Sequence, residues 1–236
     1  HLYDHVNSFP KEKQSLLEQS KQLVLLQPGL SITDTAEGLT ISGTYLLNSS
    51  YNDIPLYDEY QVKIIVPWEF PTAIPSIWEV GGKVPRESTF GHFLDNGELC
   101  LGANCDLISC LIEEPTVSHY VCSLLESYFY SASYYIEYGG MPDFGERSHG
   151  VYGLIEAYKE RYGVSDDNLL IDLLFYLIKR TPYRGHIQCP CHSGRKLRQC
   201  HGPKVLQDLN SEYYMWFYKD AIAILYHFYE ERYPKE

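Results

Sequence analysis

The sequence predicts an α+β protein: one helix, then an antiparallel meander of strands with a flanking helix, then a mainly helical C-terminal region. Apolar and polar residues alternate in short runs before residue 81, a pattern typical of strands with one buried face. After residue 115, apolar residues recur at helical spacing instead. A Gly-rich segment over residues 139–150 lies between two helical stretches and is typical of a linker. We therefore predict two domains, residues 1–140 and residues 141–236.

The first domain is expected to begin with a helix over residues 11–23. Pro10 suits the first turn of that helix, and Leu16 and Leu23 offer an apolar face to a core. The alternating runs then predict three strands, over residues 39–46, 59–66 and 76–80.

Turn-forming residues separate these strands at residues 48–53 and along the Pro-rich segment 67–75. After Pro115, a helix is predicted from Thr116 to about residue 135, before the Gly pair that opens the linker. We expect this helix to pack its apolar face against the meander.

The second domain is expected to be helical throughout. Apolar residues at helical spacing predict one helix from residue 151 and a second from Asp166 to Ile178, which basic residues and Pro182 close. An aromatic-rich helix is predicted over residues 209–233.

Composition limits the function. The 236 residues include 44% hydrophobic ones, enough for a real core, and the net charge of −12 argues against nucleic-acid binding as the overall role. Residues 179–204 nevertheless carry seven basic residues and no acid. One interpretation is that these basic side chains bind an acidic protein surface or a phosphate backbone. The alternative is that they offset the thiolate charge around a metal. No apolar run is long enough for a membrane span and no signal peptide is recognisable, so we expect a cytoplasmic protein.

Three cysteines and a histidine gather between residues 189 and 201 in a pattern that indicates a metal site. A Cys-x-Cys pair, Cys189 and Cys191, is followed by adjacent Cys200 and His201. Three thiolates and one imidazole form a ligand set that suits a structural Zn²⁺. The alternatives are buried free cysteines or a disulfide, but Cys-x-Cys is a strained pairing and the chain has an odd total of seven cysteines.

The run over residues 187–203 resembles the SEC-C motif, the zinc knuckle found at the end of the SecA translocation ATPase and appended to many unrelated bacterial proteins. His192 stands where that family usually has Gly. The resemblance implies a knuckle that docks a partner or stabilises a small domain, so any chemistry must be sought upstream.

Two upstream segments stand in a recognisable order. Residues 70–78 read Phe-Pro-Thr-Ala-Ile-Pro-Ser-Ile-Trp, residues 92–101 read His-Phe-Leu-Asp-Asn-Gly-Glu-Leu-Cys-Leu, and a predicted helix follows. With the N-terminal helix and the meander, this order resembles the ubiquitin-conjugating-enzyme fold. That family has a Tyr-Pro-x-x-x-Pro-like turn, a His-Pro-Asn flap and a Gly-x-Ile-Cys-Leu active-site strand. The resemblance covers residues 1 to about 140 and leaves the knuckle outside.

The resemblance implies that Cys100 is a nucleophile that accepts the carboxyl terminus of a ubiquitin-like protein as a thioester. A thiolate attacks well, and its thioester stays reactive toward an acceptor amine or hydroxyl. The chain has no Gly-rich phosphate loop, so a ubiquitin-activating-like enzyme is an implied partner. The alternative is that Cys100 is only a small buried hydrophobic residue at a strand end.

The chain departs from the family around its flap. Gly91-His92-Phe93 stands in place of His-Pro-Asn, and Cys100 follows His92 at a spacing of only eight positions. The Asn that would steady an oxyanion is missing there. Asn96 and Asn104 are candidate substitutes. His92 would position the flap or move a proton, or else be structural. Bacterial members of the superfamily, found in conjugation and anti-phage defence operons, resemble this sequence better.

Other cysteines compete with Cys100. Cys105 and Cys110 are expected in a loop after Cys100, among the acidic residues Asp106, Glu113 and Glu114, and Cys122 on the helix that follows. Cys105 is a minor candidate nucleophile, while Cys110 and Cys122 are interpreted as structural.

Three functions are therefore carried forward from the sequence. The first is a ubiquitin-conjugating-like transferase with Cys100, His92 and Asn96 as catalytic residues, whose zinc knuckle recruits the activating enzyme, the modifier or an unidentified target. The second is a catalytically inactive binding or scaffold module with the same fold. The third, weaker one is a nucleic-acid or translocation adaptor built around the knuckle.

Overall fold

A computed structural model describes residues 4–86, 90, 92–143, 148 and 150–234, with side chains from residue 11 onward. Within these residues the protein is α+β, with one four-stranded antiparallel sheet, seven α-helices and one short 3₁₀ helix. The chain divides into two compact units. The first comprises residues 1–102 and 109–145, and the second comprises residues 103–108 and 146–236. The predicted boundary after residue 140 stays a prediction.

The sheet of the first unit is a meander in which each strand pairs with the next along the chain. Its strands are β1 (Leu30–Asp34), β2 (Gly38–Tyr51), β3 (Ile54–Pro67) and β4 (Ser76–Glu79), in the order β1-β2-β3-β4. Alternate residues of β3, from Tyr60 to Val66, are buried, as a strand with one covered face requires. Asn52 and Asp53 both have positive φ, 50° and 61°, which closes the β2–β3 hairpin with a tight two-residue turn.

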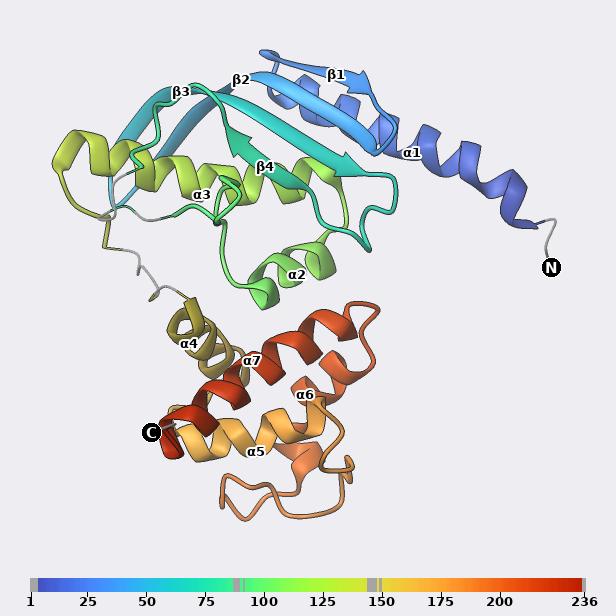
Figure 1. The fold of residues 1–236 in the computed structure, drawn as a ribbon, viewed down its shortest axis with the longest axis vertical. Helices are drawn as coiled ribbons and strands as arrows, with labels where there is room; N and C mark the ends of the chain where they lie inside the picture. The colour runs from blue at the N-terminus through green and yellow to red at the C-terminus, as the bar shows by residue number, and fades with distance from the viewer. Residues whose placement is uncertain (1–3, 87–89, 91, 144–147, 149, 235–236) are drawn as a thin grey trace. The chain divides into compact units, whose positions relative to one another are not determined.

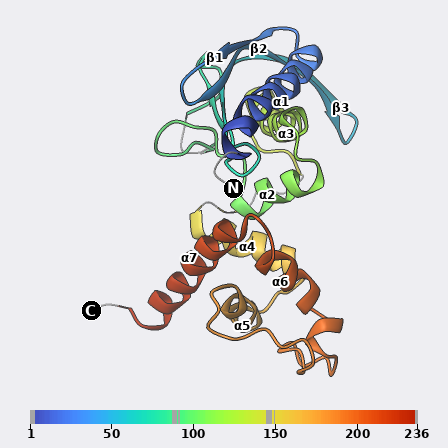
Figure 2. The same cartoon turned by 90° about the vertical axis from the view of Figure 1, so that its right-hand side faces the viewer.

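Two helices cover one face of this sheet. The helices α1 (Asp4–Leu26) and α3 (Val117–Tyr138) contact one another, and α3 contacts the central strands β2 and β3. Figures 1 and 2 show both helices beneath the sheet. Tyr60 of β3 stacks on Phe129 of α3 with ring centroids 4.0 Å apart, at the centre of the core. The Thr116 hydroxyl accepts a hydrogen bond from the His119 N–H and thereby caps α3.

The structure differs from the prediction at several elements of the first half of the chain. The helix α1 begins at Asp4 rather than at residue 11, so Pro10 lies inside it and not in its first turn. Strands β2 and β3 are longer than predicted, so residues 48–51 belong to β2 and not to a turn.

Strand β1 was not predicted, because its alternation extends over only five residues. The helix α2 (Asn104–Glu113) replaces the predicted loop, so the expectation that Cys105 and Cys110 lie in a loop was wrong. Its apolar residues at helical spacing, among them Ile108 and Leu111, are buried, and this burial outweighs the acidic residues that suggested a loop.

The second unit is helical. Its described residues include the first residues of α2 and four further α-helices with one 3₁₀ turn. It contains α4 (Gly150–Tyr162), α5 (Asp167–Leu177), the 3₁₀ turn η1 (Leu197–Gln199), α6 (Gly202–Leu209) and α7 (Tyr214–Arg232). Figure 1 shows α5 and α7 side by side, and their buried residues, such as Leu174 and Ile224, form the core of this unit. The short helix α6 was not predicted, and the last helix begins at Tyr214 rather than at residue 209.

A buried ion pair holds α6 against α4. Asp208 is completely buried and accepts hydrogen bonds from Arg161 Nε at 2.9 Å and Nη2 at 2.5 Å. The Tyr162 hydroxyl donates a third bond to the same carboxylate at 2.8 Å, and the guanidinium lies 4.7 Å from the centre of the Phe217 ring. Such bidentate, fully bonded geometry is what a buried charge needs.

The helices formed by the described residues include none with the length and apolar character of a membrane span.

Candidate metal centre and Cys100 hairpin

A short hairpin presents the first two cysteines of the metal cluster. The Cys189 N–H donates to the Arg195 carbonyl at 2.9 Å, and Gln188 bridges to Lys196. The turn between them uses left-handed backbone at His192 (φ 56°) and Gly194 (φ 75°). A residue without a side chain adopts this conformation most easily, which explains why Gly is usual at the position that His192 occupies.

A tight turn and the start of α6 present the other two donors. The Cys200 N–H donates to the Leu197 carbonyl at 3.1 Å, and His201 stands directly before α6. A Cβ added to Gly202 would lie 2.5 Å from the Leu197 carbonyl oxygen and 2.6 Å from the Tyr183 hydroxyl. Only Gly therefore allows the backbone to pass so close behind the two donors.

The structure brings all four predicted metal ligands together. The donor atoms of Cys189, Cys191, Cys200 and His201 lie within 4.8 Å of one another. Cys189 Sγ is 3.2 Å and Cys200 Sγ 3.4 Å from His201 Nδ1, and the Sγ atoms of Cys191 and Cys200 are 3.5 Å apart. Ligands of a tetrahedral zinc ion are separated by about 3.6–3.8 Å, given its usual bond lengths. The cluster is thus near the size that one such ion needs.

The cysteines of the cluster differ in acidity. A hydrogen bond with the Ser193 hydroxyl, 3.2 Å away, is the main cause that lowers the pKa of Cys191 to about 6. Burial raises the pKa of Cys189 to about 11. A bound cation would favour the thiolate at both positions, because metal ligands must be deprotonated.

Across residues 185–201, only Cys189 and Leu197 have buried side chains. The basic side chains Arg184, Arg195, Lys196 and Arg198 at or beside this segment are exposed. A segment of this size with two buried side chains lacks an apolar core, so a bound ion would add much to the backbone hydrogen bonds that fold it.

A second hairpin, residues 92–100, carries the predicted nucleophile, and we call it the Cys100 hairpin. Phe93 forms a β-bridge with Leu99, and the Leu94 N–H donates to the Glu98 carbonyl at 2.8 Å. The Leu99 N–H donates to the Ile77 carbonyl of β4 at 2.8 Å, which joins the hairpin to the sheet. Leu99 is buried, and its packing holds the backbone next to Cys100 in place.

The Cys100 hairpin makes Cys100 and His92 direct backbone neighbours. The Cys100 N–H donates to the His92 carbonyl at 2.9 Å, and both residues are half-buried. Two of the three residues predicted to be catalytic are thus brought together. This pairing joins backbone atoms, and the catalytic roles of both residues stay predictions.

The third predicted residue, Asn96, lies at the turn of this hairpin. Its side chain is exposed and bonds Glu98, with Nδ2 2.6 Å from the carboxylate and Oδ1 3.1 Å from the N–H. The alternative, Asn104, donates from Nδ2 to Asp220 at 2.8 Å within the second unit. Both amides thus have a partner other than Cys100, and the oxyanion role predicted for Asn96 stays a prediction.

Asp220 belongs to a buried polar group of the second unit. Its other carboxylate oxygen accepts a hydrogen bond from the Tyr158 hydroxyl at 3.0 Å. Burial raises the pKa of Asp220 to about 6.

The remaining cysteines of the first 140 residues are poorer nucleophiles. Cys105 is buried with 1% of its surface exposed. Burial raises the pKa of Cys110 and of Cys122, and nearby glutamates raise it further. A raised pKa disfavours the reactive thiolate.

One residue near Cys100 was missed by the sequence analysis. The Tyr128 hydroxyl on α3 donates to the His92 carbonyl at 2.8 Å. In the sequence Tyr128 looks like one of 22 tyrosines suited to packing, and no local motif marks it. Only its phase on the helix, facing the sheet side, could have suggested a role.

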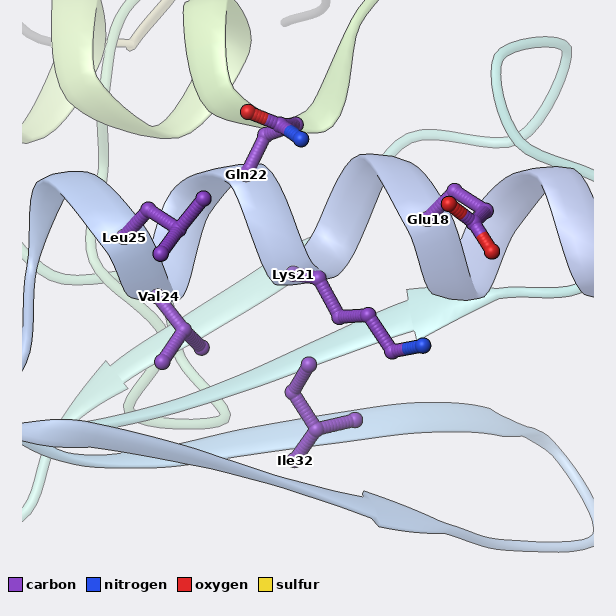
Figure 3. A pocket seen from close by; sticks show the side chains of 6 residues that line it. All are labelled: Glu18, Lys21, Gln22, Val24, Leu25 and Ile32. Atoms are coloured by element: carbon purple, nitrogen blue, oxygen red, sulfur yellow. The ribbon is translucent and has the colours of Figure 1, made fainter.

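A shallow hollow of about 410 Å³ lies elsewhere on the first unit, between α1 and β1. Figure 3 shows Lys21 and Val24 extending from α1 toward the strand, and Ile32 of β1 pointing back toward the helix. Glu18, Gln22 and Leu25 complete its lining. The candidate catalytic and metal residues are absent from this lining.

Comparison with known proteins identifies one region. Residues 188–203 match the SEC-C motif family. Neither the curated proteins nor the solved structures include a match to this chain. The SEC-C match and the Cys₃His cluster together fit a zinc-binding motif, and they confirm the predicted resemblance at the knuckle.

Proposed function

We propose that the chain is a ubiquitin-conjugating-like transferase that carries a ubiquitin-like protein as a thioester on Cys100. The observation that carries the proposal is the pairing of Cys100 with His92 in a hairpin attached to β4. The order of helix, meander, Pro-rich segment, cysteine hairpin and long helix α3 supports it, because that order resembles the conjugating-enzyme fold. The activity would belong to a bacterial conjugation or anti-phage defence operon.

The proposed reaction has two balanced steps. In the first, the Cys100 thiolate attacks the thioester that joins the modifier to the activating enzyme, a new C–S bond forms, and the thiolate of the activating enzyme leaves. In the second, an acceptor amine or hydroxyl attacks the Cys100 thioester, and the Cys100 thiolate leaves and is reprotonated. No oxidant or reductant is required.

The free state of the cysteines supports this chemistry. No disulfide joins any of the seven cysteines in the described structure. Free thiols persist in a reducing compartment, which is also where a thioester on cysteine is useful, and this agrees with the proposed cytoplasmic location.

The knuckle is proposed to hold Zn²⁺ and to dock a protein with an acidic surface. Three thiolates and one imidazole favour Zn²⁺ over hard cations. The exposed basic side chains from Arg184 to Arg198 would give such a partner its complementary charge.

The test combines the full chain with a cognate activating enzyme, its ubiquitin-like modifier and ATP. We expect an adduct that a reducing thiol removes. Cys100→Ser should replace it with a thiol-resistant ester or abolish it, because an oxygen ester resists thiol exchange. Cys110→Ser is the matched control, since Cys110 is also half-buried and should leave the adduct unchanged.

The rival function is a binding module without catalysis. The side-chain bonds of Asn96 to Glu98 and of Asn104 to Asp220 favour it, because both proposed oxyanion donors are engaged elsewhere. Stable binding of the modifier by a chain that forms no adduct, while the activating enzyme itself becomes charged, would establish this rival and reject the transferase.

A further inference from the structure

A single backbone carbonyl links Cys100 to the long helix α3. The His92 carbonyl oxygen accepts the Cys100 N–H at 2.9 Å and the Tyr128 hydroxyl at 2.8 Å. Tyr128 lies on α3, the helix that packs against β2 and β3. The two hydrogen bonds therefore connect the backbone of the predicted nucleophile to the core of the first unit.

Aromatic packing fixes the Tyr128 side chain at this carbonyl. Only 7% of Tyr128 is exposed, and its ring meets Phe90 edge to face with centroids 5.8 Å apart. Phe90 is completely buried and meets the His92 ring in the same way at 4.9 Å. A phenol packed in this way keeps one rotamer, so its hydroxyl is already in place to donate to the His92 carbonyl.

The electrostatic surroundings keep the hydroxyl protonated. Burial raises the pKa of Tyr128, and negative charge on Cys100 raises it further. The phenol is therefore a permanent hydrogen-bond donor at neutral pH.

We propose that Tyr128 is a positioning residue for Cys100, acting through the His92 carbonyl. The inference rests on the proposed function in that Cys100 is taken as the nucleophile. Without the hydroxyl, the Cys100 hairpin keeps its hydrogen bond to β4 at Leu99 and the ring contact of His92 with residue 128, but it loses this hydrogen bond to α3. Cys100 would then sample more orientations, and fewer of them would suit attack on a bulky protein thioester.

The experiment compares Tyr128→Phe with Tyr130→Phe in the full chain. Tyr130 is the matched control because it lies on the same helix, is 2% exposed, and directs its hydroxyl to the carbonyls of Ile54 at 2.9 Å and Tyr51 at 3.4 Å. Both variants lose one hydroxyl that bonds a backbone carbonyl, so their thermal stabilities should fall by similar amounts. Ile54 belongs to the far end of the β2–β3 hairpin, away from the Cys100 sequence.

Two readouts need no conjugation partner. In Tyr128→Phe, hydrogen exchange of the Cys100 amide should be about fivefold faster, as the loss of one hydrogen bond of ordinary strength implies. Alkylation of Cys100 by iodoacetamide, measured by peptide mass spectrometry, should also accelerate, because the freed hairpin exposes the thiol. Tyr130→Phe should change neither rate. Equal changes in the two variants, or no change in either, would overturn the proposal.

A third readout separates this inference from the proposed function. With the activating enzyme, modifier and ATP, charging of Tyr128→Phe should be slower by about the same fivefold factor although its thiol alkylates faster. Opposite changes in the two rates identify loss of orientation rather than loss of access. If wild-type protein is never charged but the exchange and alkylation differences hold, the positioning role stands and the transferase function fails. If wild-type protein is charged and Tyr128→Phe is charged equally fast, the positioning role fails and the transferase function stands.

Discussion

The zinc knuckle and the Cys100 hairpin are both short turns that present cysteines, yet different forces hold them. Within residues 185–201, which hold all four donors of the knuckle, only the side chains of Cys189 and Leu197 are buried, so we expect a metal held by these donors to supply most of the cohesion. The Cys100 hairpin instead is tied to β4 through Leu99 and to α3 through Tyr128. We expect a bound metal to fold the knuckle, which has hardly any core, whereas the Cys100 hairpin is held by a core that forms without a metal.

Metal removal should separate the two regions most strongly. Structural zinc contributes on the order of 10 kcal/mol to folding small knuckles. Chelation or Cys191→Ser should therefore abolish amide protection over residues 185–201, measured by hydrogen exchange, while α3 and β3 keep theirs. Cys110→Ser, which leaves the cluster intact, is the control. Equal loss of protection in both regions would contradict the claim that the metal folds the knuckle alone.

The next largest expected effect is a loss of stability on breaking the buried ion pair between Arg161 of α4 and Asp208 of α6. Asp208→Ala leaves the Arg161 guanidinium buried without its partner and should lower the free energy of unfolding of the second unit by about 3–5 kcal/mol. Asp167→Ala removes an ion pair with Lys159 in which the Asp167 side chain is 52% exposed, and should cost less than about 1 kcal/mol. Denaturant titration measures both variants. Similar losses would show that α6 is not anchored by Asp208.

The two units should respond to pH with opposite sign. The pKa of Asp220 is raised to about 6 by burial, so the folded second unit binds this proton more tightly than the unfolded chain does. Its stability should fall by about 3 kcal/mol as the pH rises from 3 to 7, through the unfolded and then the folded pKa, given about 1.36 kcal/mol per pKa unit. Asp220→Asn should flatten this slope.

In the first unit, the corresponding carboxyl group is Asp58. Burial opposes its ionisation, but hydrogen bonds from Lys83, the Glu59 N–H and Ser133 lower its pKa below the usual value. Its contribution to stability is present at neutral pH and is lost as the pH falls through the lowered pKa. Thermal unfolding between pH 3 and 7, followed separately for each unit, checks both signs. A common slope that both Asp58→Asn and Asp220→Asn leave unchanged would contradict these assignments.

The smallest effect concerns the turn of the knuckle. His192 has a φ of 56°, which costs a residue with a side chain more than it costs Gly. His192→Gly should stabilise the metal-bound knuckle by up to about 1 kcal/mol, measured as slower zinc release to a chelator. Gly194→Ala, at a φ of 75°, should act in the opposite direction. Faster release from His192→Gly would show that the histidine contributes something that offsets its backbone strain.

The sequence predicts the metal cluster better than the surroundings of Cys100, because the cluster depends on local spacing. The metal donors are visible in the sequence because Cys189 to His201 is one short local run, and local spacing alone determines that they can meet. The α+β class and the helices α3 and α5 follow from long periodic patterns. Strand β1 is too short for its pattern to stand out, and α2 is stabilised by buried residues that its acidic neighbours conceal.

The surroundings of Cys100 depend on contacts between distant parts of the chain. The bond from Tyr128 to His92 joins residues 36 positions apart, and Leu99 meets Ile77 through backbone atoms that carry no side-chain signature. The sequence could therefore suggest Cys100 and His92 as a pair but could not show what holds them. The tyrosine that holds the Cys100 hairpin became recognisable only in the folded chain.

The most direct test of the central claim is the intact mass of the full chain after incubation with its activating enzyme, ubiquitin-like modifier and ATP. We expect a mass increase equal to the modifier less one water, reversed by a reducing thiol, absent from Cys100→Ala and retained by Cys110→Ala. A charged activating enzyme beside an unmodified chain, or an adduct that survives in Cys100→Ala, would contradict it.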